Sequence, residues 1–333
     1  MDAIRTDALT KHYTVGFWRP QPYLALDGLS LSVSEGEVFG FLGPNGAGKT
    51  TTLKLLMQLI FPTSGSAEIF GQPVGDIEVR RRIGYLPENP YFYDQLTAEE
   101  LLEYFAGLFG YRGAERRTRA ARLLDTVGIG GERRLQLRKF SKGMIQRVGI
   151  AQALINDPDL VFFDEPMSGL DPLGRRDIRE LILTLRAAGK TVFFSSHVLA
   201  DAEALCSRVG IVVGGRLVAA GHLSEMLASH VRGWDVVASG LTAEALARAQ
   251  ASGHIQRASQ LGSDRTALLF PVSTPPATVI TQVAAWGGQL VSLNPLHDTL
   301  EEFFVRQVAA TTVDRGLRVE AQGDRAPMPG SRR

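Results

Sequence analysis

The chain has 333 residues, 44% of them hydrophobic, so it is long enough for one large domain and a second, smaller one. Its 36 basic and 35 acidic residues nearly cancel, which argues against a nucleic acid or an anionic lipid surface as a partner recognised by overall charge. The single cysteine, Cys206, excludes an internal disulfide and suits a reducing compartment.

The first residues lack a basic start followed by an apolar run, so we expect no signal peptide. No apolar run approaches the roughly 18 to 20 residues that a membrane-spanning helix needs. Strands are expected at 8–15 and 29–34, the second because apolar and polar residues alternate there. Tyr13 in the first of these has two interpretations, a platform for a nucleobase or an ordinary strand tyrosine.

Residues 38–42 form a short apolar run typical of a buried strand, and residues 51–60 carry apolar residues at helical spacing. Between them, Gly43 to Thr50 reads Gly-Pro-Asn-Gly-Ala-Gly-Lys-Thr, the phosphate-loop pattern. Glycines let the backbone wrap closely around an anion, and the helix start adds a positive dipole. Lys49 is expected to reach the outer phosphates and Thr50 to place its hydroxyl on Mg²⁺.

A short strand at 83–87 ends at Glu88, which is a candidate contact for Mg²⁺ or water if the strand belongs to a parallel sheet. A helix is predicted after Thr97, which has the N-cap and acidic first turn of a helix start. A second helix is predicted at 114–127, and a third begins near Ser141 and runs to 154. Ser141 and Gly143 mark either a second anion site or a plain N-cap.

Residues 160–163 form an apolar strand that ends in Asp164 and Glu165. Because burying charge is costly without a binding partner, we expect Asp164 to orient the shell of a magnesium ion. Glu165 is expected to polarise the attacking water. The turn at 168–172 follows, and the buried strand at 190–196 ends at His197, which is placed to bond a terminal phosphate.

After His197 the sequence predicts a hairpin turned by two glycines and a short helix at 223–228. Residues 229–310 follow the order βαββαβ of a ferredoxin-like unit, without a histidine or carboxylate cluster. The last helix there, at 300–305, is expected either to regulate, dimerise or dock, or to be a structural element only. Residues 311–333 have few apolar residues, so we expect them to be disordered.

These motifs, in this order from Tyr13 to His197, resemble the nucleotide-binding subunit of an ATP-binding cassette (ABC) transporter. The resemblance assigns Walker A to 43–50, the Q-loop region to Glu88, the signature to 140–144, Walker B to 160–164 and the D-loop to 168–171, with His197 as the switch histidine. The sequence departs from the family's pattern at two places. Glu88 occupies the position where the family usually has glutamine, and the signature reads Phe-Ser-Lys-Gly-Met. Both departures resemble exporter-type subunits whose membrane partner is a separate chain.

The resemblance implies an α/β P-loop NTPase fold with a mixed sheet, an antiparallel β subdomain and a helical insert at about 90–155. It divides the chain into an ATPase domain at 1–228, a small α+β domain at 229–310 and a tail at 311–333. It implies ATP and Mg²⁺ as cofactors, with Thr50, Asp164 and Glu88 as metal contacts and Glu165, His197 and Lys49 as catalytic residues. The implied ATP contacts are Tyr13, Gly43, Pro44, Asn45, Gly46, Ala47, Gly48, Lys49, Thr50, Thr51, Ser141, Gly143 and Asp171.

In this family the signature of one subunit closes the ATP bound to another, so the resemblance implies a dimer with itself or with a homologous subunit. It also implies a separate transmembrane permease and a peripheral place on the cytoplasmic face of the membrane. The resulting expectation is an ATPase that energises export. An alternative is a soluble ATPase acting on ribosomes or DNA, although only about 90 residues separate Thr50 from Phe140, too few for a long coiled coil. A third candidate, a GTPase or small-molecule kinase, leaves the signature segment unexplained.

Overall fold

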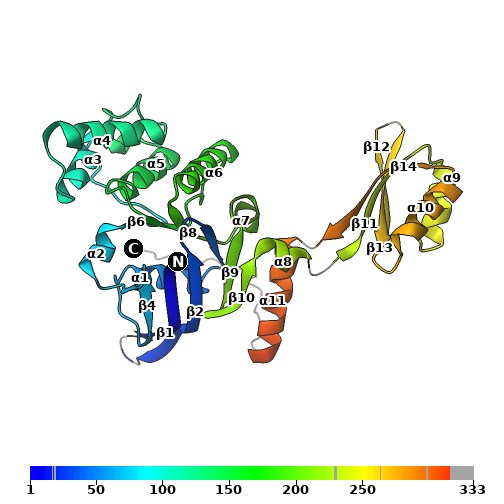
Figure 1. Ribbon diagram of the computed structural model, residues 1–333, viewed down its shortest axis with the longest axis horizontal. Helices are drawn as coiled ribbons and strands as arrows, with labels where there is room; N and C mark the ends of the chain where they lie inside the picture. The colour runs from blue at the N-terminus through cyan, green and yellow to red at the C-terminus, as the bar shows by residue number, and fades with distance from the viewer. Residues whose placement is uncertain (17, 19, 229–230, 263, 298, 316–333) are drawn as a thin grey trace, which may run out of the picture.

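The computed structural model describes residues 1–16, 18, 20–228, 231–262, 264–297 and 299–315, and within this part the strands form three sheets. Two sheets lie together in a large N-terminal body, and the third lies apart from it, near the end of the chain (Figure 1).

The central sheet has the strand order β10-β9-β3-β8-β7-β6. Its strands are β3 (Val38–Leu42), β6 (Ile83–Leu86), β7 (Leu160–Asp164), β8 (Thr191–Ser196), β9 (Arg208–Val213) and β10 (Arg216–His222). All neighbours pair in parallel except β9 and β10, which form the predicted glycine-turned hairpin. The carboxyl ends of β3, β6, β7 and β8 therefore meet along one edge, where the sequence places its phosphate loop, Glu88, Glu165 and His197.

An antiparallel sheet with the order β2-β1-β4-β5 lies beside the central sheet. It consists of β1 (Asp2–Val15), β2 (Gln21–Ser34), β4 (Ser64–Ile69) and β5 (Gln72–Pro73). β1 and β2 are longer than the sequence predicted. In each strand the predicted half pairs with the unpredicted half of the other, since residues 2–6 pair with 31–34 and residues 11–15 with 21–26. In β2, the carbonyl oxygen of Ala25 lies against the phosphate loop at Gly48.

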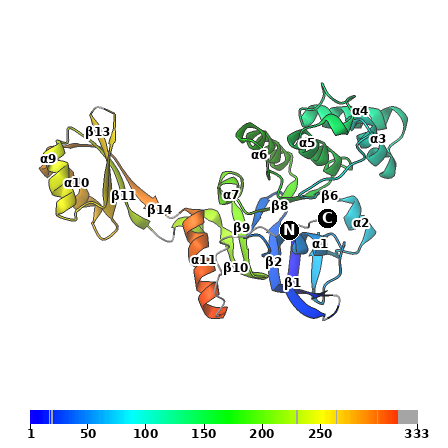
Figure 2. The ribbon, with the colours of Figure 1, turned by 180° about the vertical axis from the view of Figure 1, so that it is seen from behind.

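Helices complete the N-terminal body. They are α1 (Lys49–Leu56), α2 (Ile77–Arg81), α3 (Ala98–Leu108), α4 (Gly113–Thr126), the 3₁₀ helix η1 (Leu137–Lys139), α5 (Lys142–Ala153), α6 (Pro172–Ala187), α7 (Leu199–Leu205) and α8 (Leu223–Ala228). The predicted N-cap of α3 is confirmed, because Thr97 and Glu100 form a reciprocal capping box. Helices α3, α4 and α5 group at the edge of the body nearest β6, best seen from behind (Figure 2).

Two apolar cores cover the two faces of the central sheet. Phe162 and Phe193 face the core that lies under the antiparallel sheet, whereas Phe163 and Phe194 face the core under the helices. This alternation follows from the two-residue period of a strand, and it explains why β7 and β8 read as continuous apolar runs. Charged residues at the ends of these strands are therefore held by a rigid, doubly covered sheet.

Helix α1 ends earlier than predicted. Apolar residues at helical spacing predicted a helix as far as residue 60, but Gln58 has a left-handed φ of 51° and the helix ends at Leu56. The N–H of Leu59 bonds the carbonyl of Lys54 at 2.8 Å, and that of Gln58 bonds the carbonyl of Leu55 at 2.9 Å. This is the Schellman arrangement, which satisfies the last carbonyls of a helix.

The third sheet has the order β12-β13-β11-β14 and is antiparallel throughout. Its strands are β11 (Val231–Ser239), β12 (Arg257–Leu261), β13 (Arg265–Pro271) and β14 (Gln289–His297), and its helices are α9 (Ala243–Ala251) and α10 (Pro276–Ala285). The order βαββαβ was predicted. With the mixed central sheet, the antiparallel sheet and the helices α3 to α5, it confirms the expected fold class.

The last helix, α11 (Leu300–Arg315), corrects two expectations. It packs against α7, α8, β9 and β10 of the large body rather than against the third sheet, so the α+β unit ends with β14 and does not reach residue 310 (Figure 1). The reason is its apolar start: Leu300 is fully buried in the helical core, and its N–H bonds Glu203 Oε1 at 2.7 Å. Residues 311–315 continue this helix, whereas the rest of the tail predicted to be disordered, 316–333, lies outside the described residues.

Over the described ranges, no helix combines the length and the apolar character that crossing a membrane requires.

Candidate active site

The phosphate loop connects β3 to α1 and lies against two other parts of the body. Gly48 has a left-handed φ of 105°, and a Cβ there would lie 2.7 Å from the carbonyl oxygen of Ala25 in β2. A Cβ on Gly43 would lie 2.3 Å from the carbonyl oxygen of Val212 in β9. Only glycine fits either position, so the loop is held tightly between two strands with the start of α1 opening into a cavity.

That cavity has a volume of about 480 Å³. Its wall consists of Tyr23, Ala25, Asn45, Gly46, Ala47, Gly48, Lys49, Thr50, Thr51, Glu88, Glu165, Ser168 and His197. The structure therefore brings Glu88, Glu165 and His197 together with most of the phosphate loop, as the parallel strands predicted. Gly43 and Pro44 are not part of the wall, but their carbonyls contact Lys49.

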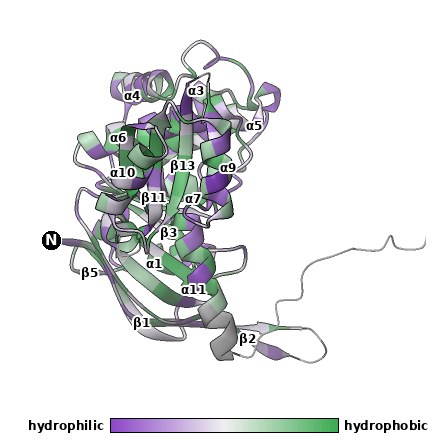
Figure 3. Ribbon diagram, turned by 90° about the vertical axis from the view of Figure 1, so that its right-hand side faces the viewer, coloured by the Kyte–Doolittle hydropathy of each residue, from purple (hydrophilic) through white to green (hydrophobic). Residues whose placement is uncertain are grey.

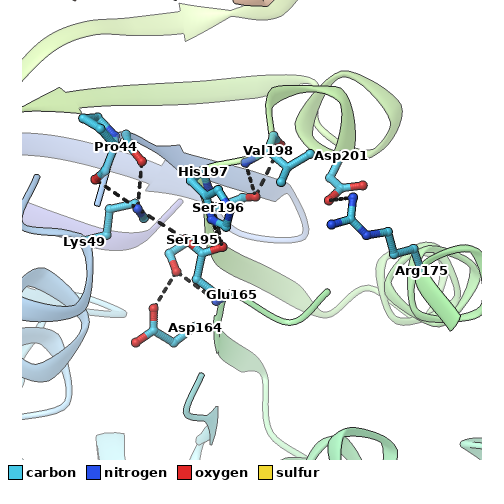
Figure 4. A network of polar contacts seen from close by, with 11 residues as sticks. Pro44, Lys49, Asp164, Glu165, Arg175, Ser195, Ser196, His197, Val198 and Asp201 are labelled. Atoms are coloured by element: carbon cyan, nitrogen blue, oxygen red, sulfur yellow. Dashed lines mark hydrogen bonds and ion pairs between the residues drawn. The ribbon is translucent and has the colours of Figure 1, made fainter. Parts of the chain in front are cut away.

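Lys49 is buried and its ammonium is fully occupied. Nζ donates to the carbonyl of Gly43 at 2.7 Å and to that of Pro44 at 3.3 Å, and it lies 3.2 Å from Glu165 Oε1 (Figure 4). A terminal phosphate would replace the two neutral carbonyls with a charged acceptor, while the ion pair with Glu165 remains.

Glu165 stands at the centre of the polar network shown in Figure 4. Its Oε2 lies 2.8 Å from His197 Nδ1, and its Oε1 is buried and accepts no hydrogen bond, having only the ion pair with Lys49. Its φ is +49°, a conformation that is strained for a residue with a Cβ. The carboxylate lines the cavity, and Oε1, which accepts no hydrogen bond, is placed to accept one from water.

Asp164, one residue earlier, is almost fully buried. It accepts a hydrogen bond of 2.6 Å from Ser195 Oγ, and Ser195 in turn accepts from the N–H of Glu165 at 3.1 Å. Burial raises the pKa of Asp164, and hydrogen bonds from Ser195 and Thr50 oppose that rise. Ser195 was not among the predicted site residues, and its only signal in the sequence was a polar residue in an apolar strand.

A magnesium ion fits this donor set. Thr50 offers a hydroxyl, and Asp164 and Glu88 offer carboxylates, the oxygen ligands that Mg²⁺ prefers. In the described part of the chain, no three His, Cys, Asp or Glu side chains cluster closely enough to hold a metal by themselves. Mg²⁺ in nucleotide sites usually keeps several waters and is held by one or two carboxylates together with substrate phosphates.

The aromatic residue in the cavity wall differs from Tyr13, the residue predicted to stack on a nucleobase. Tyr23 lines the cavity, whereas Tyr13 does not. The two residues pair directly across β1 and β2, so their side chains share one face of the hairpin. The Lys11 ammonium lies 5.3 Å from the Tyr13 ring, whereas the Tyr23 ring is half exposed beside the phosphate loop. The signal for Tyr23 was an aromatic residue in the second strand of the hairpin.

Tyr23→Ala is therefore expected to weaken ATP binding more than Tyr13→Ala. Loss of one stacked ring costs about 1–3 kcal/mol, which is roughly five- to a hundredfold in the dissociation constant. Titration of each variant with ATP measures this difference directly. A larger loss in Tyr13→Ala would return the stacking role to Tyr13.

A second cavity, of about 560 Å³, contains the remaining predicted residues. Ser141, Lys142 and Gly143 form one side and residues 169–171 the other, and it shares no wall residue with the first cavity. Ser141 caps α5 by accepting from the N–H of Met144, and Asp171 caps α6 by accepting from that of Gly174 at 2.8 Å. Ser141 is therefore an N-cap, whereas its role as an anion contact stays a prediction. The turn at 168–171 reaches from one cavity to the other.

Beyond His197, ion pairs join α6 to α7. Asp201 is almost fully buried and lies 3.8 Å from Arg175 (Figure 4). It also lies 3.6 Å from Arg179. Burial raises the pKa of Asp201, and both arginines oppose the rise. These ion pairs fix the segment that carries His197 relative to the turn between the cavities.

Comparison with known proteins agrees with these features. A family model described as ABC transporter matches residues 26–168. An uncharacterized ABC transporter ATP-binding protein of Nostoc is 46% identical over 315 residues, covering 92% of this chain and 89% of that protein. The bacitracin transport ATP-binding protein BcrA of Bacillus licheniformis is 42% identical over 218 residues, covering 65% of this chain and 68% of that protein. A solved dimer of the ATP-binding cassette MJ0796 with ADP and Pi is 30% identical, with a TM-score of 0.61, and covers 66% of this chain and 98% of that one.

Proposed function

Because this chain belongs to the ATP-binding subunits of ABC transporters, and so is an ATPase, we propose that it energises export through a separate membrane permease. Export-type relatives, among them the bacitracin transport protein, support this direction of transport. The alternative, a soluble ATPase acting on ribosomes or DNA, is not favoured by any of these relatives. The cytoplasmic face of the membrane is where such a subunit would meet both ATP and the permease.

The observation that carries the proposal is the separation of the two cavities. The first holds the phosphate loop, Glu165 and His197, whereas Ser141 and Gly143 lie in the second. One subunit therefore cannot bring its own Ser141 to its own phosphate loop without a rearrangement. Two subunits placed head to tail can, and each would then supply the phosphate loop to one ATP and Ser141, Gly143 and Asp171 to the other.

In this arrangement Lys49 and the start of α1 bind the phosphates, and Thr50, Asp164 and Glu88 would hold Mg²⁺. That ion, when bound, neutralises charge on the phosphates. Glu165 polarises the water that attacks the terminal phosphate, with its carboxylate held between Lys49 and His197. His197 bonds the same phosphate. Positioning and electrostatics supply most of the catalysis, because the protein forms no covalent bond with the substrate.

A groove beside α3 is the proposed docking site for a cytoplasmic segment of the permease. It has a volume of about 490 Å³ and lies between β6, the segment after it, and the ends of α1 and α3. Its wall is mostly apolar and includes Tyr91, Phe92, Phe105 and Phe109. Tyr91 is 90% exposed and Phe109 is 44% exposed, so the groove presents exposed rings within one apolar wall. Pro87 lines the groove, and the next residue, Glu88, lines the first cavity. We therefore expect docking at the groove to shift Glu88 in the first cavity.

Affinity purification of the tagged chain from membranes tests this function. A multi-span membrane protein should co-purify, and Tyr91→Ala should reduce its recovery. Tyr104→Ala is the matched control. Like Tyr91, Tyr104 is an exposed tyrosine, but it lies on α3 and does not line the groove. Recovery of ribosomes or DNA in place of a membrane protein would contradict the proposal.

A further inference from the structure

The third sheet has one covered face and one open face. Helices α9 and α10 lie on the same side of it, and the core there contains Val236, Leu268 and Phe270 (Figure 1). No other described helix packs against the opposite side. The open face therefore consists of the alternate residues of the four strands.

The open face combines polar residues on the neighbouring strands with apolar residues on the central strand β13. β13 reads Thr-Ala-Leu-Leu-Phe-Pro after Arg265 and is coloured mostly hydrophobic in Figure 3. Ala267 and Leu269 are half-buried on the open face, whereas their neighbours Leu268 and Phe270 are fully buried on the other. A strand that is apolar on both faces is typical of a sheet covered on both sides.

One row of the open face carries opposite charges on either side of Leu269. The register pairs Arg257 with Leu269, Leu269 with Asp235, and Asp235 with Asn294. Arg257 and Asp235 are both exposed, and neither forms an ion pair with another described residue. Together with Leu296 and Ser259 they surround a hollow of about 280 Å³.

This row is complementary to itself. Suppose that two sheets face each other about a two-fold axis that runs along β13. Leu269 then lies opposite the partner's Leu269, and an Arg257–Asp235 pair between the two copies forms on each side of the axis. An axis across the strands would instead place Arg257 against Arg257 and Asp235 against Asp235, which is unfavourable. Of these two axes, the charges of this row favour the one along β13. Arg265, exposed on the same face at the start of β13, would lie opposite the partner's Arg265 across that axis, so one like-charge pair accompanies the two opposite-charge pairs.

We propose that the open face of the third sheet is a contact surface for the same face of a second copy of this chain. The proposal rests on the proposed pairing of two subunits. Four strands about 4.8 Å apart and some six residues long give a face of about 400 Å², half of what one partner buries in a standard stable interface. The contact is accordingly too small to hold a dimer by itself, and it forms when the ATPase bodies have already brought the two sheets together.

Cross-linking of the full-length chain tests this contact. Ala267→Cys places a thiol at the proposed axis, and Ala284→Cys on the outer side of α10 is the matched control, because both replace alanine in the same unit. The native Cys206 is buried, so it should contribute little background. In a Glu165→Gln background with ATP and Mg²⁺, a short bismaleimide should join Ala267→Cys chains into dimers and leave Ala284→Cys chains single.

Charge exchange makes the test specific to the packing. Asp235→Arg and Arg257→Asp should each lower the cross-linked fraction about five- to tenfold, and the double exchange should restore it, because two ion pairs are lost and regained. Equal cross-linking at the two cysteines would overturn the inference, as would protection of Ala267→Cys from maleimide without cross-linking. If light scattering shows no ATP-dependent dimer at all, the pairing of subunits in the proposed function is contradicted, and with it the surface assignment. If the dimer forms but Ala267→Cys does not cross-link, only the surface assignment fails.

Discussion

Glu165→Gln is expected to slow ATP hydrolysis by at least about a hundredfold while leaving ATP bound between two subunits. Glutamine keeps the size of the side chain, but it cannot accept a proton from water, and loss of a positioned base costs about 10²–10⁴ in rate. The contacts that hold the phosphates, from Lys49 and the start of α1, remain. Phosphate release measures turnover, and light scattering with and without ATP measures pairing.

The matched control for this variant is Glu180→Gln. Glu180 is exposed on α6 and pairs with Arg176, away from both cavities. It should hydrolyse ATP at the normal rate and should not accumulate as a dimer. Normal turnover in Glu165→Gln would remove Glu165 as the base, and loss of turnover without an ATP-dependent dimer would remove the explanation by trapping.

Lys49→Ala is expected to weaken ATP binding by about ten- to a hundredfold, the usual contribution of a charged hydrogen bond. Isothermal titration with ATP measures the change. Lys54→Ala is the matched control, because Lys54 lies in the same helix but is exposed and is not part of either cavity wall.

Lys49→Ala also leaves Glu165 buried without its ion pair, which is costly for folding. The double variant Lys49→Ala/Glu165→Gln removes that buried charge and separates the two effects. Weak ATP binding in both variants, with normal thermal stability in the double variant, would assign the loss to the phosphate contact. Normal affinity in the double variant would show that Lys49 does not bind phosphate.

The sequence predicted the central sheet and its charged edge well, because strong local rules coincide there. Five apolar residues, a glycine loop and a helical pattern leave few alternatives for Val38 to Leu56. The placement of Glu88, Glu165 and His197 in one cavity follows from parallel strands ending at a common edge. The roles of these residues in binding and hydrolysis stay predictions, to be decided by the variants above.

The sequence could not decide those features that depend on long-range packing. Whether Tyr13 or Tyr23 reaches the cavity depends on how the hairpin meets the phosphate loop, which no local pattern reveals. The last helix has an apolar start, but nothing in that pattern says whether Leu300 packs on the third sheet or on the ATPase body. Likewise, the separation of Ser141 from Lys49 is a property of the folded body, visible only once both cavities are in place.

Complementation between two inactive variants tests the central claim, that each ATP lies between two copies of the chain. Ser141→Asp keeps an N-cap for α5 but places a carboxylate where it repels the phosphates of ATP. Lys49→Ala removes the charged phosphate contact of the phosphate loop. In a mixed dimer, the intact loop of one variant meets the intact Ser141 of the other, so the mixture should regain ATP hydrolysis that neither variant has alone. A mixture as inactive as its components would contradict a shared site.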